Sequence, residues 1–125
     1  VGAPGAMLAG GVLLLGGVGV ALGGAAIVDF GIALGLVGVG WNFMYVGATT
    51  LLTDACRDEE KPALQAFNDS VVFLSVTLAT LGAAWLVDEL GWATVNRLAA
   101  VPVLLLMAGV LGALWRRRAG LASAA

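Results

Sequence analysis

Charged residues divide this chain into four long uncharged runs, at positions 1–28, 30–53, 70–87 and 98–115. A helix needs about 20 apolar residues to cross a hydrocarbon core of about 30 Å, so each run is long enough, or nearly so, to span a bilayer. The pattern therefore predicts an all-α, polytopic membrane protein. Its four transmembrane helices are expected at about residues 4–22, 28–53, 62–88 and 93–115.

The second run, from Phe30 to Thr53, is interrupted near its middle by the cluster Trp41-Asn42-Phe43-Met44-Tyr45. Tryptophans in bilayers usually lie at the headgroup level, so this cluster is unusual for a helix that faces lipid. On a helix, one stripe joins small residues to polar ones: Gly31, Gly35, Gly38, Asn42, Tyr45, Thr49 and Thr53. We expect a neighbouring helix to approach the small end closely, and the polar end to face protein or water.

We interpret Trp41, Asn42, Tyr45 and, less strongly, Thr49 as candidates for the lining of a solute cavity. Tryptophan and tyrosine offer flat apolar faces to a solute, and asparagine offers a donor and an acceptor. The alternative is that Trp41 and Asn42 only bond to a neighbouring helix, an interaction worth about 0.6–2 kcal/mol. The sequence leaves both interpretations open.

Composition and charge strengthen the membrane assignment and suggest an orientation. Hydrophobic residues make up 61% and charged residues 11%, against about 45–50% and about 25% in soluble domains. Four spans place the N-terminus, the 54–69 connection and the C-terminus on one side. That side holds five basic residues: Arg57, Lys61, Arg116, Arg117 and Arg118. By the positive-inside rule this side is cytoplasmic. We therefore expect residues 1–118 to form the membrane portion and residues 119–125 a cytoplasmic tail. The expected location is a bacterial inner membrane.

The polar connection 54–69 contains three candidates for cytoplasmic gating contacts: Asp54, Arg57 and Asp69. Asp69 comes just before the third uncharged run and shares a helical face with Phe73. The alternative is that Asp69 is only the polar foot of a helix, lying in headgroups and water.

Two residues carry signals for the ends of helices. Asp29 is expected to cap the start of the second helix, where a carboxylate accepts from free N–H groups and complements the helix dipole. A proton-coupling role for Asp29 is the alternative. Gly91 is expected to cap the end of the third helix.

The sequence offers no set of side chains for an enzyme. It has no histidine, and the lone Cys56 has no partner for metal binding or catalysis, so we expect no catalytic residue, no metal and no cofactor. Its few basic residues do not predict a nucleic-acid interface, although the triplet after Trp115 is placed to contact anionic lipid. The expected partners are a small-molecule solute, with a proton as a candidate coupling ion, and membrane lipid.

Several short motifs follow one another along the chain: Met7-Leu8, Leu13-Leu14, Gly16-Gly17, Gly40-Trp41-Asn42-Phe43, Thr53-Asp54-Ala55, Glu59-Glu60-Lys61, Gln65-Ala66, Asn68-Asp69, Gly91-Trp92, Val95-Asn96 and Pro102. In this order and spacing they resemble helices 9 to 12 of major facilitator superfamily (MFS) permeases. The resemblance covers nearly the whole chain, and it depends on the series of motifs more than on any one of them.

The resemblance implies the C-terminal third of a twelve-helix secondary transporter, which moves a small solute by alternating access around a central cavity. Helix 10 of this family contributes to the cavity, in agreement with the interpretation of Trp41, Asn42 and Tyr45. The family's basic connection of the D-R-x-G-R-R kind would lie before Val1, and the chain starts without Met. We therefore expect a fragment whose partner is the missing N-terminal part of the same transporter.

Two other functions remain open from the sequence. A complete four-helix exporter that acts as a dimer fits the length, but proton-coupled exporters of this kind need an acid deep in the first helix, and residues 1–28 contain none. A non-transporting membrane assembly subunit would use its small faces as partner interfaces. Substitution of Asn42 would then change assembly and leave solute flux unaffected.

Overall fold

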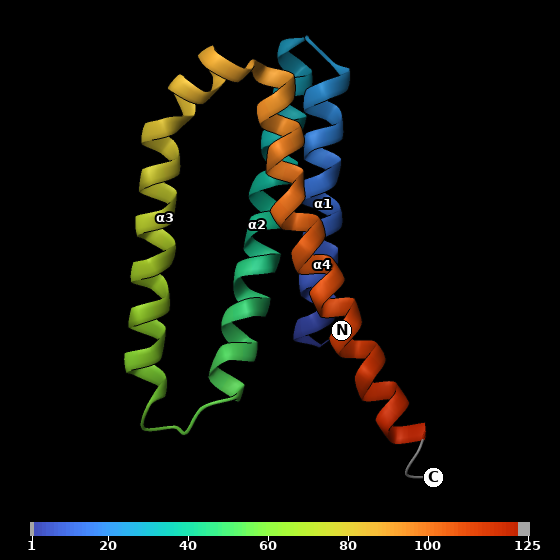
Figure 1. Ribbon diagram of the computed structural model, residues 1–125, viewed down its shortest axis with the longest axis vertical. Coiled ribbons are helices and arrows are strands. Elements are labelled where there is room, and N and C mark those ends of the chain that lie inside the picture. Colours follow the sequence, from blue (N-terminus) through green and yellow to red (C-terminus); the bar gives the residue numbers. More distant parts are fainter. Residues whose placement is uncertain (1, 123–125) are drawn as a thin grey trace.

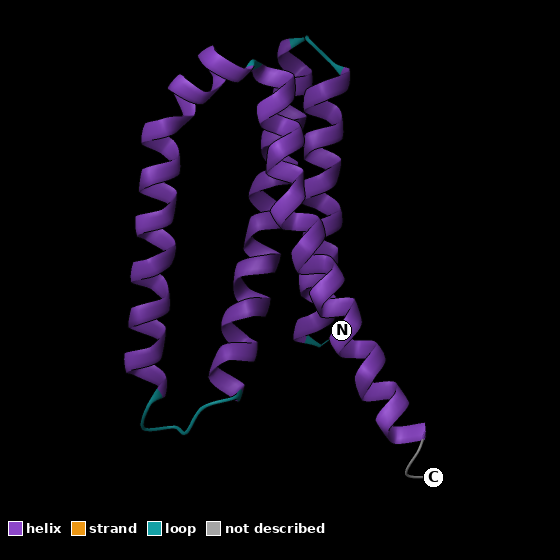
Figure 2. Cartoon of the chain, viewed as in Figure 1, coloured by secondary structure: helices purple, strands orange, loops and turns teal. Residues whose placement is uncertain are grey.

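The computed structural model describes residues 2–122, and all regular structure in this part of the chain is α-helical (Figure 2). The helices are α1 (Ala3–Gly23), α2 (Ile27–Asp54), α3 (Lys61–Leu90) and α4 (Trp92–Ala122). All four are long and apolar enough to cross a membrane. The structure thus confirms the all-α fold with four membrane helices.

The C-terminal helix is longer than the sequence suggested. It was expected to end near Trp115, but α4 continues through residues 119–122, which belong to the expected tail. This segment contains two alanines and a leucine, which favour a helix, and it lacks proline. Residues 123–125 of the expected tail lie outside the described residues. Pro102 lies inside α4.

Two helix ends are capped as the sequence predicts. The N–H of Ala26 donates a hydrogen bond of 3.0 Å to Oδ2 of Asp29, in the first turn of α2. Gly91 separates α3 from α4 with a φ of +77°, a left-handed conformation that favours glycine, and its N–H donates to the carbonyl of Val87 at 2.9 Å. These caps allow two very short connections, one between α1 and α2 and one between α3 and α4.

Helices α1 and α2 pack backbone against backbone. A Cβ on Gly10 would lie 2.6 Å from the carbonyl oxygen of Gly40, and a Cβ on Gly47 would lie 2.9 Å from that of Ala3. Only glycine permits such an approach, which maximises dispersion contacts between helices in lipid. Met44 is buried between these glycines and fills the space beside Gly10.

The face of α2 that approaches its neighbour is therefore not the expected one. The small end of the expected stripe is open, because a Cβ on Gly31, Gly35 or Gly38 would meet no atom of the described structure within 4 Å. The close contacts lie instead on the stripe that contains Gly40 and Gly47. Small residues occur on both faces of α2, so their spacing alone could not decide which face is covered.

Helix α4 packs against α1 and crosses in front of α1 and α2 in the view of Figure 1. The indole N–H of Trp92 donates a hydrogen bond of 3.0 Å to the carbonyl of Ala21, and its ring meets Phe30 edge-on at 5.6 Å. Further along, a Cβ on Gly11 would lie 2.6 Å from Cγ of Met107. Trp92 thus joins the start of α4 to the adjacent ends of α1 and α2.

Helix α3 stands apart from the other helices over most of its length (Figure 1). None of its thirty residues, all of them within the described part of the chain, is buried. It contacts α4, and it contacts α2 along one stretch. This stretch forms the candidate site.

Candidate functional site

A groove of about 470 Å³ lies between the middle of α2 and the middle of α3. Its lining combines aromatic, apolar and amide side chains from both helices: Trp41, Asn42, Tyr45, Val72, Phe73 and Val76. The structure thus places three of the four predicted cavity residues around one hollow. The volume lies within the range of about 300–1,000 Å³ that is typical of small-molecule pockets.

The wall contributed by α2 is flat and aromatic. Trp41 and Tyr45 are one helical turn apart, so their rings lie one above the other, with centroids 6.3 Å apart and planes inclined by 15°. Trp41 remains 46% exposed. The stacked pair therefore leaves one planar, mostly apolar face available, and such a face suits another flat ring.

Asn42 supplies a polar group to the groove. Its Nδ2 donates a hydrogen bond of 2.8 Å to the carbonyl of Gly38, one turn earlier in α2. Within residues 2–122 this is the hydrogen bond that the Asn42 side chain makes, and it stays within α2. The side-chain carbonyl and the second N–H of this amide are then available as acceptor and donor.

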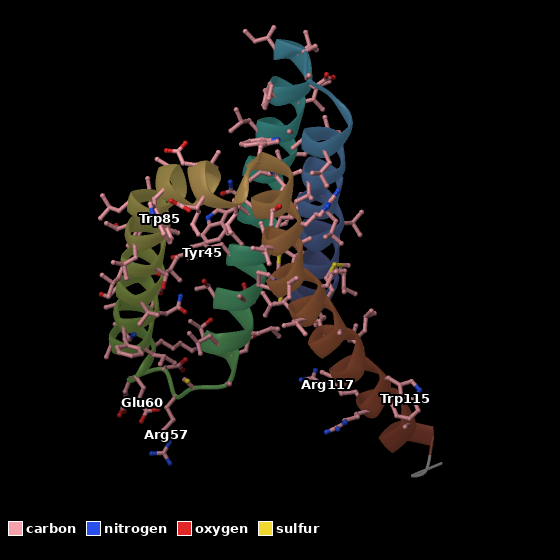
Figure 3. All side chains as sticks on the ribbon, turned by 45° about the horizontal axis from the view of Figure 1, so that its top comes forward. Tyr45, Arg57, Glu60, Trp85, Trp115 and Arg117 are labelled. Carbon is pink, nitrogen blue, oxygen red and sulfur yellow. The ribbon has the colours of Figure 1, made fainter. Side chains whose placement is uncertain are left out.

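Tyr45 connects the two walls of the groove. Its hydroxyl donates a hydrogen bond to Oδ1 of Asp69 on α3, and Figure 3 shows Tyr45 on the side of α2 that faces α3. A predicted cavity residue thus contacts a predicted gating residue. Thr49 lies one turn further along α2 and outside the groove, where its hydroxyl oxygen is buried and has no hydrogen-bond partner in the described structure.

The other two gating candidates are not brought to this site. Asp54 is the last residue of α2, and Arg57 lies in the 55–60 connection. Both side chains are exposed. Among the described side chains the ion pair of this region joins Lys61 to Asp58 at 2.6 Å. Of the three candidates, only Asp69 borders the groove through a direct contact with a residue of its lining.

Sequence reasoning missed the α3 wall and the pairing of Tyr45 with Asp69. Val72 and Val76 carry no polar signal, so nothing in the third run marked them. The short connection between α2 and α3 is the signal that could have identified the pair, because it makes the two helices antiparallel neighbours. Tyr45 lies nine residues before the end of α2, and Asp69 lies eight residues after the start of α3, so antiparallel helices place them at one level.

Comparison with known proteins places part of this sequence beside a transporter. A riboflavin transporter, RfnT, from Brucella anthropi is 39% identical to this chain over 77 residues, which are 62% of this chain and 19% of the relative. The matched segment thus spans about a fifth of the relative's length. No protein-family model and no solved structure match the chain. The four apolar helices and this similarity together identify an integral membrane protein related in part to a transporter.

Proposed function

We propose that this chain forms the last third of a secondary transporter of the major facilitator type, which moves a small solute by alternating access. The observation that carries the proposal is the groove between α2 and α3, with Trp41, Asn42 and Tyr45 in its lining. The similarity to part of a riboflavin transporter supports transport as the function. The N-terminal part of the same transporter supplies the remaining walls of the cavity.

The solute class follows from the lining. A stacked aromatic pair offers a face for a flat ring, and the free amide groups of Asn42 suit the polar edge of a heterocycle. Riboflavin, the solute named for the relative, has a flat ring of this kind with a polar edge. We therefore propose a flat, hydrogen-bonding heterocycle of the flavin type as the solute, bound without covalent chemistry or a cofactor.

Alternating access requires part of the cavity wall to move, and α3 is suited to this. It contributes no buried residue, and a single side-chain hydrogen bond joins it to α2 among the described side chains. Release of the bond from Tyr45 to Asp69 opens the lower end of the groove, and its formation closes it. Asp69, as the carboxylate nearest the solute, is also the candidate site for a coupling proton.

The experiment is transport by the full natural chain in the inner membrane of a bacterium that requires riboflavin and lacks its own importer. Growth on low riboflavin and uptake of labelled riboflavin are expected, and Trp41→Ala should reduce both while the folded yield in detergent remains. Proteoliposomes filled with riboflavin test the opposite direction. A folded protein that moves neither riboflavin nor related flat heterocycles in either direction would contradict the proposal and favour an assembly subunit.

A further inference from the structure

A second groove, of about 550 Å³, opens at the end of the molecule where α1 begins and α2 and α4 end. It is almost entirely apolar, and its lining includes residues from all three helices: Pro4, Leu51, Pro102, Leu105, Gly109 and Arg117. It shares no lining residue with the groove between α2 and α3. We infer that this groove binds an anionic phospholipid, with an acyl chain along α4 and the phosphate on the guanidinium of Arg117.

The dimensions of the groove match one leaflet of a bilayer. Its α4 wall is a single helical stripe that starts at Pro102 and repeats every three or four residues as far as Arg117. The apolar part, from Pro102 to Ala113, rises about 16 Å at 1.5 Å per residue, close to half of a hydrocarbon core of about 30 Å. Arg117 lies one further turn along, which is the level of the headgroups.

The stripe is hollowed by its small residues. Gly109 has no side chain, and a Cβ there would meet no atom of the described structure within 4 Å. The neighbouring Leu105 is 69% exposed. Small residues thus form the floor of a channel that leucines border, and a flexible hydrocarbon chain fills such a shape without a fixed partner helix.

The charge at the mouth selects the headgroup. Arg117 is the one charged side chain in the lining and forms no ion pair with any described residue. Figure 3 shows Arg117 and Trp115 on different sides of α4, so the guanidinium is turned away from the exposed indole. A guanidinium presents paired N–H donors that match phosphate oxygens. A second copy of this chain is a poorer occupant, because it would bring two arginine-rich helix ends together.

The test is lipid binding by the full natural chain, measured by native mass spectrometry in detergent with phosphatidylglycerol and phosphatidylcholine of identical acyl chains. Phosphatidylglycerol should bind more tightly than phosphatidylcholine. Arg117→Gln should weaken the binding of phosphatidylglycerol about fivefold and leave the binding of phosphatidylcholine nearly unchanged. This is the effect expected for the loss of one basic residue near a membrane surface. Arg117→Lys should restore part of the loss.

Two further variants separate this site from general attraction between charges. Arg97→Gln removes the same charge from the opposite end of α4 and should leave the binding of both lipids unchanged. Ala113→Phe fills the groove and should weaken the binding of both lipids to the same extent. Arg117→Gln changes an exposed helix end and keeps the fold, so the test stands even if the filled variant is unstable. Equal effects of Arg117→Gln and Arg97→Gln, or a second copy bound in place of lipid, would overturn the inference.

Discussion

The hydroxyl of Tyr45 on α2 donates a hydrogen bond to the carboxylate of Asp69 on α3. Among the described side chains this is the one side-chain hydrogen bond between these two helices, and it lies at the edge of the groove that Trp41 and Asn42 line. It joins the closely packed part of the structure to the helix that has no buried residue. The relation between solute binding and helix movement can therefore be tested at this pair.

Removal of the Tyr45 hydroxyl should loosen α3. Tyr45→Phe retains the ring stack with Trp41 but loses the donor, so the free energy of unfolding should fall by about 0.6–2 kcal/mol, the usual value of an interhelical bond in membranes. Thermal unfolding in detergent measures this change. If Tyr45→Phe and Asp69→Ala have additive effects in a double-mutant cycle, the two side chains are not coupled.

Loss of the Asn42 amide should affect transport more than folding. Asn42→Leu removes the donor and acceptor that face the groove, so transport at low solute concentration should fall about 3- to 10-fold, the equivalent of one hydrogen bond. Thr50→Val is the matched control, because Thr50 bonds to the carbonyl of Val46 in the same way but lies outside the groove lining. Transport equal to that of the unmodified protein would remove Asn42 from the site.

Glycine substitutions should show which face of α2 is packed. Gly10→Ala places a Cβ 2.6 Å from the carbonyl oxygen of Gly40, so the helices must separate and the free energy of unfolding should fall by about 1–3 kcal/mol. A Cβ on Gly38 would meet no atom of the described residues, so Gly38→Ala should leave the free energy of unfolding nearly unchanged. The free energy of unfolding of both variants is measured from the folded fraction during titration with a denaturing detergent. Equal losses would place the neighbouring helix on the other face of α2.

The orientation of the chain can be read from Cys56, which lies in the 55–60 connection and is partly exposed. We predict that a membrane-impermeant maleimide labels Cys56 only after the cells are opened, because the positive-inside rule places this connection in the cytoplasm. In a Cys56→Ala background, Glu89→Cys should be labelled on intact cells. The reverse pattern would invert the proposed orientation.

The fold could be predicted largely from the charges. Asp29, Asp54 and the charged residues near Gly91 separate the apolar runs, and a chain in lipid satisfies its backbone only as a helix or a closed barrel. The stripe through Asn42 and Tyr45 identified a polar face of α2, which the structure places along the groove. The helical period of 3.6 residues was enough to predict which residues share that face and how far apart they lie along the helix.

The sequence could not supply the contacts between helices. Gly38 and Gly40 are equivalent as residues, yet only Gly40 meets a neighbour. The choice depends on the rotation of α2 about its axis, which the whole set of packing contacts determines. Tyr45 and Asp69 were both identified as candidates, but their hydrogen bond depends on the depth of two helices relative to each other. The length of the 55–60 connection limits that depth without fixing it.

The hydrogen bond from Trp92 to Ala21 has a consequence for the order of assembly, because it joins residues that are 71 positions apart. Helices α1 and α2 are neighbours in the chain and can pack as soon as both have been synthesised. The contact with α4 must wait until α3 has crossed the membrane and Trp92 has emerged, and closing so long a loop is slow. We therefore expect the docking of α4 on α1 to follow the packing of α1 against α2.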